Sequence, residues 1–155
     1  MIALVQRCKS ASVTVNEEIV GKINNGVTVF VGVFKEDGEK ECDFLAKKLS
    51  NLRIFTDNDD KMNLSLLDVN GEVLAISNFT LCANAKKGTR PSYDSAARPE
   101  TANPLYERFC TKLLENGIKS VQKGIFGEHM EVLVSNDGPV SVILDTDKIM
   151  AKNNG

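Results

Sequence analysis

The segment 26–34, with the sequence GVTVFVGVF, restricts the possible folds more than any other part of the chain. β-branched and aromatic residues favour extended strands. Apolar residues here occupy both of the faces that a strand presents in alternation. Such a strand is stable only when both faces are covered. The segment therefore predicts a strand that is buried on both sides.

Other segments predict further strands, because apolar and polar residues alternate along them. The segment 12–23 alternates, turns and then resumes, which indicates a hairpin. Another strand is expected after the Asn-Gly turn at 70–71. Near the end of the sequence, the segments 129–136 and 140–146 are expected to form an antiparallel-looking pair joined by a turn at 137–139.

Two segments have the apolar spacing of amphipathic helices. The first lies within 37–55 and ends in a short strand; its apolar positions are Cys42, Leu45, Leu49 and Leu52. The second is predicted to start with Asn103 as N-cap and Pro104 as first helical residue, and to end at Gly117. We therefore expect an α+β fold with largely antiparallel, barrel-like β-sheets and two covering α-helices.

Chain length, net charge and the distribution of apolar residues limit the number of domains and the kinds of partner that we expect. The 155 residues suffice for one core, so we expect a single domain over 1–150 and a flexible tail over 151–155. The net charge of −2 gives no global basic field for a nucleic acid, although a local basic patch can still bind phosphates. No apolar stretch could span a membrane, and Arg7 and Lys9 interrupt any signal-peptide core. We expect a cytoplasmic protein without a membrane partner.

Cysteine and histidine usage disfavours several kinds of site. The four cysteines are widely spaced without a CxxC pair, and His129 is the only histidine, so we expect reduced, mostly buried thiols and no metal or cofactor. Nothing in the sequence brings His129 to a nucleophile. An enzyme of this sequence has no evident side-chain base, so its substrate should already be activated. Amino-acid esters of ribose are of this kind, because the neighbouring hydroxyl can take part.

Three segments have the residue types for such a site, and each has a simpler alternative. SNFT (77–80) offers hydroxyls and an aromatic ring, or is a strand end. KKGTRPSY (86–93) offers Lys86, Lys87 and Arg90 to phosphates, or is a solvated part of a long loop. NDGPVS (136–141) contains Gly138–Pro139, or is a turn. Most X–Pro bonds are trans, but a cis bond here would orient two adjacent carbonyls to one side.

Together these segments resemble the D-aminoacyl-tRNA deacylase family, and the likeness covers nearly the whole chain. The matching motifs, in order, are VQR, ASVTV, NLRIF, KMNLSLLDV, GEVLAISNFTL, KKGTRPSY, PLYERF, FGEHMEV and NDGPVSVILD. The resemblance implies a homodimeric editing enzyme, a carboxylic ester hydrolase without a cofactor. Its partners would be D-aminoacyl-tRNA and glycyl-tRNA mischarged on tRNA(Ala), and no DNA is expected. Hydrolysis would release free D-amino acid and tRNA.

The resemblance also implies roles for particular residues. Ser77, Asn78, Phe79 and Thr80 would line the catalytic pocket. A cis Gly138–Pro139 would reach into the partner subunit's pocket and reject L-amino acids. Catalysis would be assisted by the 2′-hydroxyl of the terminal ribose, whereas an older interpretation makes Thr80 the nucleophile.

Further residues would support this pocket. Arg7 would help to orient the Gly-Pro motif, and the terminal adenosine would lie near Phe126, Gly127 and Met130, with core packing as the alternative role of Phe126. The RNA would also contact the three basic residues Lys86, Lys87 and Arg90. The sequence departs from the family pattern at Asn78, where Gln is usual, and at Ser141, where Thr is usual. Two other functions stay open, a non-catalytic nucleic-acid-binding module and a small-molecule esterase.

Overall fold

The computed structural model describes residues 1–151, so the predicted tail 151–155 lies outside the described residues except for Ala151. The elements in chain order are β1 (Ile2–Val15), β2 (Glu18–Ile23), β3 (Gly26–Gly32), α1 (Glu39–Asn51), β4 (Phe55–Thr56), β5 (Met62–Leu64), α2 (Leu66–Val69), β6 (Glu72–Ser77), the 3-10 helix η1 (Phe79–Cys82), α3 (Pro99–Glu115), β7 (Val121–Lys123), β8 (Glu131–Asp145) and α4 (Thr146–Ile149).

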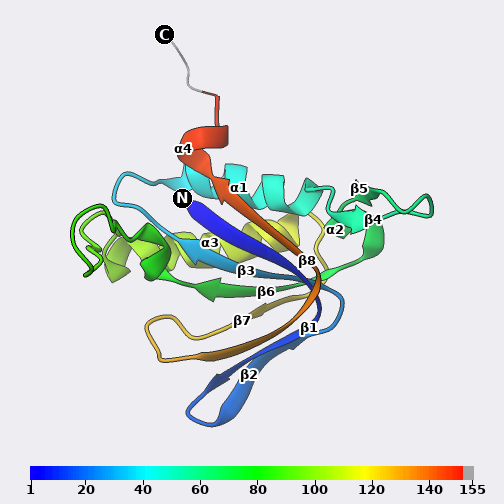
Figure 1. Cartoon of the computed structure of the whole chain (residues 1–155), viewed down its shortest axis with the longest axis horizontal. Helices are drawn as coiled ribbons and strands as arrows, with labels where there is room; N and C mark the ends of the chain where they lie inside the picture. The colour runs from blue at the N-terminus through cyan, green and yellow to red at the C-terminus, as the bar shows by residue number, and fades with distance from the viewer. Residues whose placement is uncertain (152–155) are drawn as a thin grey trace.

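The long strand β1 organises the main sheet (Figure 1). Its first half lies between β3 and β8, and its second half lies between β2 and β8, always antiparallel. The predicted β1–β2 hairpin is present, with Asn16 and Glu17 at positive φ in the turn. Beyond β3 the sheet continues through β6 and β7 in parallel pairs. Because β2 also contacts β6 and β7, the sheet curls until it is nearly closed.

The strand predicted from segment 26–34 is β3, and its burial on both faces is confirmed, since only Phe30 is partly accessible. On one side, Val27 and Val29 pack into a core completed by Leu45 of α1 and Phe109 of α3. Both long helices lie together over this face in Figure 1. They are the two predicted covering helices, and α2 and α4 add one turn each.

A second core cluster fills the inner side of the curled sheet. Its buried members are Cys8, Ala11, Val13, Ile23, Leu74 and Ile76. Partly buried Phe30, Met130 and Val132 pack against them. The sheet is thus covered on both sides, by helices on one and by its own curvature on the other.

Helix α3 begins earlier than the sequence predicted. Its first residue is Pro99 after the N-cap Arg98, so Pro104 lies inside the helix rather than at its start. Two amide groups, of Thr101 and Ala102, donate to the Arg98 carbonyl and close the first turn. The extra turn also buries Ala102. Pro99 was the better candidate for the first helical position, because proline is favoured there.

The predicted strand pair at the end of the chain is one strand, β8. Both halves pair with β1, so they do not pair with each other. The register shifts between Gln6, which is opposite Ser141, and Cys8, which is opposite Asn136. The predicted turn at 137–139 is therefore a bulge in a continuous strand, made possible because β1 is long enough to hold both halves.

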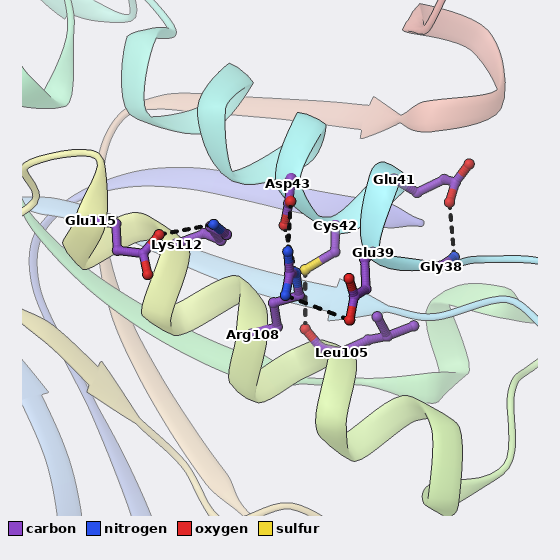
Figure 2. A network of polar contacts seen from close by, with 9 residues as sticks. All are labelled: Gly38, Glu39, Glu41, Cys42, Asp43, Leu105, Arg108, Lys112 and Glu115. Atoms are coloured by element: carbon purple, nitrogen blue, oxygen red, sulfur yellow. Dashed lines mark hydrogen bonds and ion pairs between the residues drawn. The ribbon is translucent and has the colours of Figure 1, made fainter.

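A polar network joins the two long helices on their accessible side (Figure 2). Arg108 of α3 donates to both carboxylate oxygens of Asp43 of α1, at 2.7 and 2.9 Å. Glu39 adds a longer ion pair at 3.6 Å. The Arg108 guanidinium lowers the pKa of the Asp43 carboxyl, mainly through these hydrogen bonds. This bidentate pair fixes how α1 and α3 sit side by side.

All four cysteines are buried and free, as predicted. Burial raises the pKa of Cys42 and of Cys110 to about 12, and the pKa of Cys82 to about 11. The Cys42 thiol donates to the Leu105 carbonyl at 3.2 Å (Figure 2). These thiols are therefore neutral packing groups rather than nucleophiles.

Candidate functional site

A cleft of about 740 Å³ opens where the ends of β3 and β6 meet the start of β8. Phe30, Ile76 and Val132, which belong to the edge of the second core cluster, form part of its apolar lining. Further parts of the wall come from η1, from the loop before α3 together with the first turn of α3, and from the segment 126–130. The connection from η1 to α3 and the connection from β7 to β8 both project from the left side in Figure 1.

The SNFT segment forms the polar wall of this cleft, since all four of its residues line it. Strand β6 ends at Ser77, and the Asn78 amide makes the last bond of the ladder, donating to the Val31 carbonyl at 2.8 Å. Asn78 then caps η1, which carries Phe79 and Thr80 out of the sheet. The segment is thus both a strand end and the wall of a cleft.

Two aromatic residues of the cleft lining, Phe79 and Tyr93, contact each other. Phe79 is 56% exposed and meets Tyr93 edge to face, with ring centroids 5.2 Å apart. Such a pair orients two rings that would otherwise be free to rotate. Tyr93 is not among the residues predicted for the site, although it ends the KKGTRPSY motif and binding residues often lie on loops.

The three residues predicted to lie near an adenosine also line the cleft. Phe126 is partly buried and packs on the main core, with its ring 6.4 Å from that of Tyr106. Gly127 has a φ of 80° and open space where a side chain would be. Met130 packs against the second core cluster. Phe126 therefore combines core packing with an accessible face.

His129 lies closer to the predicted site than the sequence indicated. It is exposed and lines the same cleft as Ser77 and Thr80, together with Glu128. Within residues 1–151, however, no hydrogen bond joins the imidazole to either hydroxyl. The Thr80 hydroxyl donates instead to the Asn78 side chain. The cleft thus contains no assembled nucleophile–base pair.

The basic residues Lys86, Lys87 and Arg90 lie outside the cleft lining, on an exposed loop. Two reciprocal backbone hydrogen bonds of 2.8 Å between Asn84 and Ser92 close the base of this loop. None of the three cations forms an ion pair with a described residue. The loop therefore presents free positive charge beside the cleft.

Arg7 and the Gly138–Pro139 pair lie together, away from the cleft of their own chain. Arg7 is 9% exposed and donates to two backbone carbonyls, of Asp137 at 3.0 Å and of Ile54 at 2.7 Å. The Gly138–Pro139 peptide bond is cis. Both residues of the pair are exposed on β8.

Metal-binding clusters and membrane-spanning helices are both absent from residues 1–151. No three histidine, cysteine, aspartate or glutamate side chains in residues 1–151 are grouped as metal ligands. No helix in the same range is long and apolar enough to cross a membrane.

Known proteins resemble this chain over almost its full length. The sequence profile of the family described as D-Tyr-tRNA(Tyr) deacylase matches residues 4–145. A protein of Thermotoga petrophila named D-aminoacyl-tRNA deacylase is 52% identical, covering 96% of this chain and 99% of that protein. A protein of the same name from Brevibacillus brevis is 51% identical, covering 94% of this chain and 100% of that protein.

Solved structures share the fold. A protein named c-Myc DNA Unwinding Element Binding Protein is 37% identical with a TM-score of 0.89, covering 94% of this chain and 98% of that chain. A probable eukaryotic D-amino acid tRNA deacylase, only 16% identical, has a TM-score of 0.80 over 92% of this chain and 97% of that chain, which shows the same fold. The resemblance seen in the motifs is confirmed, and the chain belongs to the D-Tyr-tRNA(Tyr) deacylase family.

Proposed function

We propose that this protein hydrolyses the ester bond between a D-amino acid and the terminal adenosine of tRNA, releasing free D-amino acid and tRNA. Membership of the deacylase family supports this proposal. The observation that carries it is the position of the SNFT segment, which lines a cleft that has hydroxyls and aromatic rings but no assembled nucleophile–base pair. Such a cleft suits an ester that needs positioning more than it needs attack by a side chain.

The chemistry is the addition of water to the ester carbonyl. The bond between the carbonyl carbon and the ribose oxygen breaks, and a proton passes to that oxygen. We propose that the vicinal 2′-hydroxyl of the ribose assists this proton transfer in place of a protein base. A tRNA that ends in 2′-deoxyadenosine and is aminoacylated on its 3′-hydroxyl should then be cleaved much more slowly, and an unchanged rate would exclude this role.

Chiral selection is proposed to come from a second copy of the chain. Gly138 and Pro139 are exposed and lie away from their own cleft, so they can enter the cleft of a partner. The same strand carries Leu133 and Ile143, which are 59% and 66% exposed and are suited to an interface. Within residues 1–151, β8 pairs with β1 and with no other strand, so its other edge is available for association. In the homodimer, the carbonyls of the pair would leave no room for an L side chain.

Contacts to the RNA are proposed on both sides of the cleft. Phe126, Gly127 and Met130 would hold the terminal adenosine, because they line the cleft and include an aromatic face. The exposed loop with Lys86, Lys87 and Arg90 would contact phosphates. We place this activity in the cytoplasm, where charged tRNA is used.

The direct test compares D-tyrosyl-tRNA and L-tyrosyl-tRNA as substrates of the purified protein. We expect catalytic turnover of the D ester only, with glycyl-tRNA also cleaved because glycine has no side chain to reject. Equal cleavage of the D and L esters, or cleavage of neither, would refute chiral editing.

The dimer can be tested by complementation. A chain altered at Phe79 and a chain altered at Gly138 should each be weakly active alone. Mixed subunits should recover activity, because one of the two sites combines an intact SNFT wall with an intact Gly-Pro pair. Full activity of a stable monomer at high dilution would contradict the proposal.

One comparison favours a second candidate function. The solved relative with 37% identity is named as a DNA unwinding element binding protein. Binding of DNA by this chain would show as a salt-dependent complex with duplex DNA in the absence of tRNA. The net charge of −2 gives no general support for it.

A further inference from the structure

The Asn78 side chain makes two hydrogen bonds to Thr80, two residues further on. Its Oδ1 accepts from the Thr80 backbone amide at 3.2 Å. The same oxygen lies 2.5 Å from the Thr80 hydroxyl oxygen. Both residues line the cleft, Asn78 half-buried and Thr80 exposed.

These two bonds determine the direction of the Thr80 hydroxyl proton. A backbone N–H can only donate, so the side-chain atom that faces it must be the amide oxygen and not the amide nitrogen. An amide oxygen can only accept. The hydroxyl beside it must therefore donate its proton to Asn78, and only the lone pairs of Thr80 Oγ1 remain for other partners.

We propose that Asn78 is a positioning residue that holds the Thr80 proton and so makes Thr80 a hydrogen-bond acceptor for the substrate. The inference rests on the proposed function, because it assigns a role within the same cleft. It also gives a reason why Thr80 is not the nucleophile. The proton is directed at a neutral amide, which is no base, and no described residue accepts it instead.

The group that Thr80 accepts from is a donor at the aminoacyl end of the substrate. An aminoacyl ester of adenosine has two donors next to the scissile bond, the α-ammonium and the vicinal 2′-hydroxyl. Either can donate to an oxygen whose own proton is turned away. The bond would fix the position of the ester relative to the attacking water.

The side-chain length at position 78 matters for this arrangement. Asparagine reaches the amide two residues ahead in the geometry of an Asx turn, which is how Asn78 caps η1. Glutamine is one methylene longer and does not form this turn. Aspartate keeps the geometry and accepts both bonds. Asn78→Asp therefore preserves the proposed arrangement, whereas Asn78→Ala and Asn78→Gln remove it.

A double-mutant cycle on D-tyrosyl-tRNA hydrolysis tests the coupling. We expect Asn78→Ala and Thr80→Val each to lower kcat/KM by about tenfold, the effect of one good hydrogen bond. The double variant should also lose about tenfold, not about a hundredfold, because Asn78 acts through the Thr80 hydroxyl. In the Asn78→Asp background, Thr80→Val should again lower kcat/KM by about tenfold. In the Asn78→Gln background, Thr80→Val should change kcat/KM little.

A purely structural role of Asn78 predicts additive losses, and this result would overturn the proposal. Circular dichroism shows whether each variant folds, and if Asn78→Ala does not fold, the Asp and Gln backgrounds give the same comparison. Wild-type protein without activity on D-tyrosyl-tRNA would instead refute the proposed function, and this inference with it. Additive losses in an active enzyme would refute only the inference.

Modified substrates identify the donor. Replacing the α-ammonium by hydrogen, as in a 3-(4-hydroxyphenyl)propionyl ester, removes the first donor, and a terminal 2′-deoxyadenosine removes the second. Thr80→Val should have no further effect on whichever substrate lacks the donor that Thr80 binds. If Thr80→Val keeps its full effect on both substrates, Thr80 accepts from neither donor and the proposal is wrong.

Discussion

Arg7 donates through its Nε to the carbonyl oxygen of Asp137 at 3.0 Å, joining residues 130 positions apart. The bond lies where the β1–β8 ladder is interrupted. It holds the backbone immediately before Gly138, so it determines where the exposed Gly-Pro pair begins. Nη1 of the same guanidinium also donates to the carbonyl of Ile54, the residue immediately before β4.

Replacing Arg7 by lysine should destabilise the protein by about 2–3 kcal/mol, because one ammonium cannot bond both carbonyls from this nearly buried position. Urea unfolding measures the loss. Arg90→Lys, on the exposed loop, is the matched control and should change stability by less than about 0.5 kcal/mol. Equal effects of both changes would show that the Arg7 contacts are unimportant.

Gly138→Ala should be more harmful than the same change at another glycine with positive φ. At Gly138 the φ is 132°, and a Cβ would lie 2.9 Å from the Val140 backbone nitrogen. We expect a loss of about 2–4 kcal/mol. Gly88→Ala, with a φ of 64° and open space, should cost only about 1 kcal/mol. Thermal unfolding of the two variants makes the comparison, and a smaller loss at Gly138 would contradict it.

Stability should fall as the pH rises above about 9. Cys42 and Cys110 have a folded-state pKa of about 12, against 9.0 for an unhindered thiol. Between these values the unfolded chain loses thiol protons that the folded chain keeps, so unfolding becomes easier. Each thiol contributes up to about 1.4 kcal/mol per pH unit. Urea unfolding between pH 8 and 11 measures the slope, which should be smaller for Cys42→Ala; an identical slope would contradict the assignment.

Asp37→Asn should destabilise the protein by about 3 kcal/mol. The Met1 ammonium is fully buried and bonds Asp37 and Thr146, each at 2.6 Å. Removing one charge of a buried pair leaves the other poorly compensated. Asp147→Asn, at an exposed position, should have almost no effect. Chemical denaturation of both variants tests this difference, and similar losses would argue against a specific role of the pair.

Thr80→Ala should retain on the order of a tenth of the activity on D-tyrosyl-tRNA, since only one hydrogen bond is lost. A nucleophile would be indispensable, and its removal would abolish turnover. Single-turnover hydrolysis together with substrate binding separates these cases. Complete loss of hydrolysis with unchanged binding would favour the nucleophile.

Local patterns predicted the elements whose stability is local. The apolar run of β3 predicts a strand that is buried on both faces. The helical spacing of Cys42, Leu45 and Leu49 predicts a helix with one buried face. The predicted start of α3 was wrong because Pro99 and Pro104 both suit a first helical position. Burial of Ala102, which depends on the folded core, decides between them.

Long-range pairing could not be predicted in the same way. The interruption of β8 resembles a turn in sequence, and only its common partner β1 makes both halves one strand. At the site, the SNFT motif indicated the wall of the cleft. Tyr93 and His129 come from other segments of the sequence, so no local pattern could place them in the same cleft as Thr80.

The pairing of Ile2 with Asp145 also has a consequence for biosynthesis. During synthesis on the ribosome, the edge of β1 that pairs with β8 stays unpaired until nearly all of the other strands and helices have been made. An unpaired strand edge of this length can associate with other nascent chains. Premature termination or slow translation before β8 should therefore favour aggregation, and chaperones that shield nascent strands should matter most during this interval.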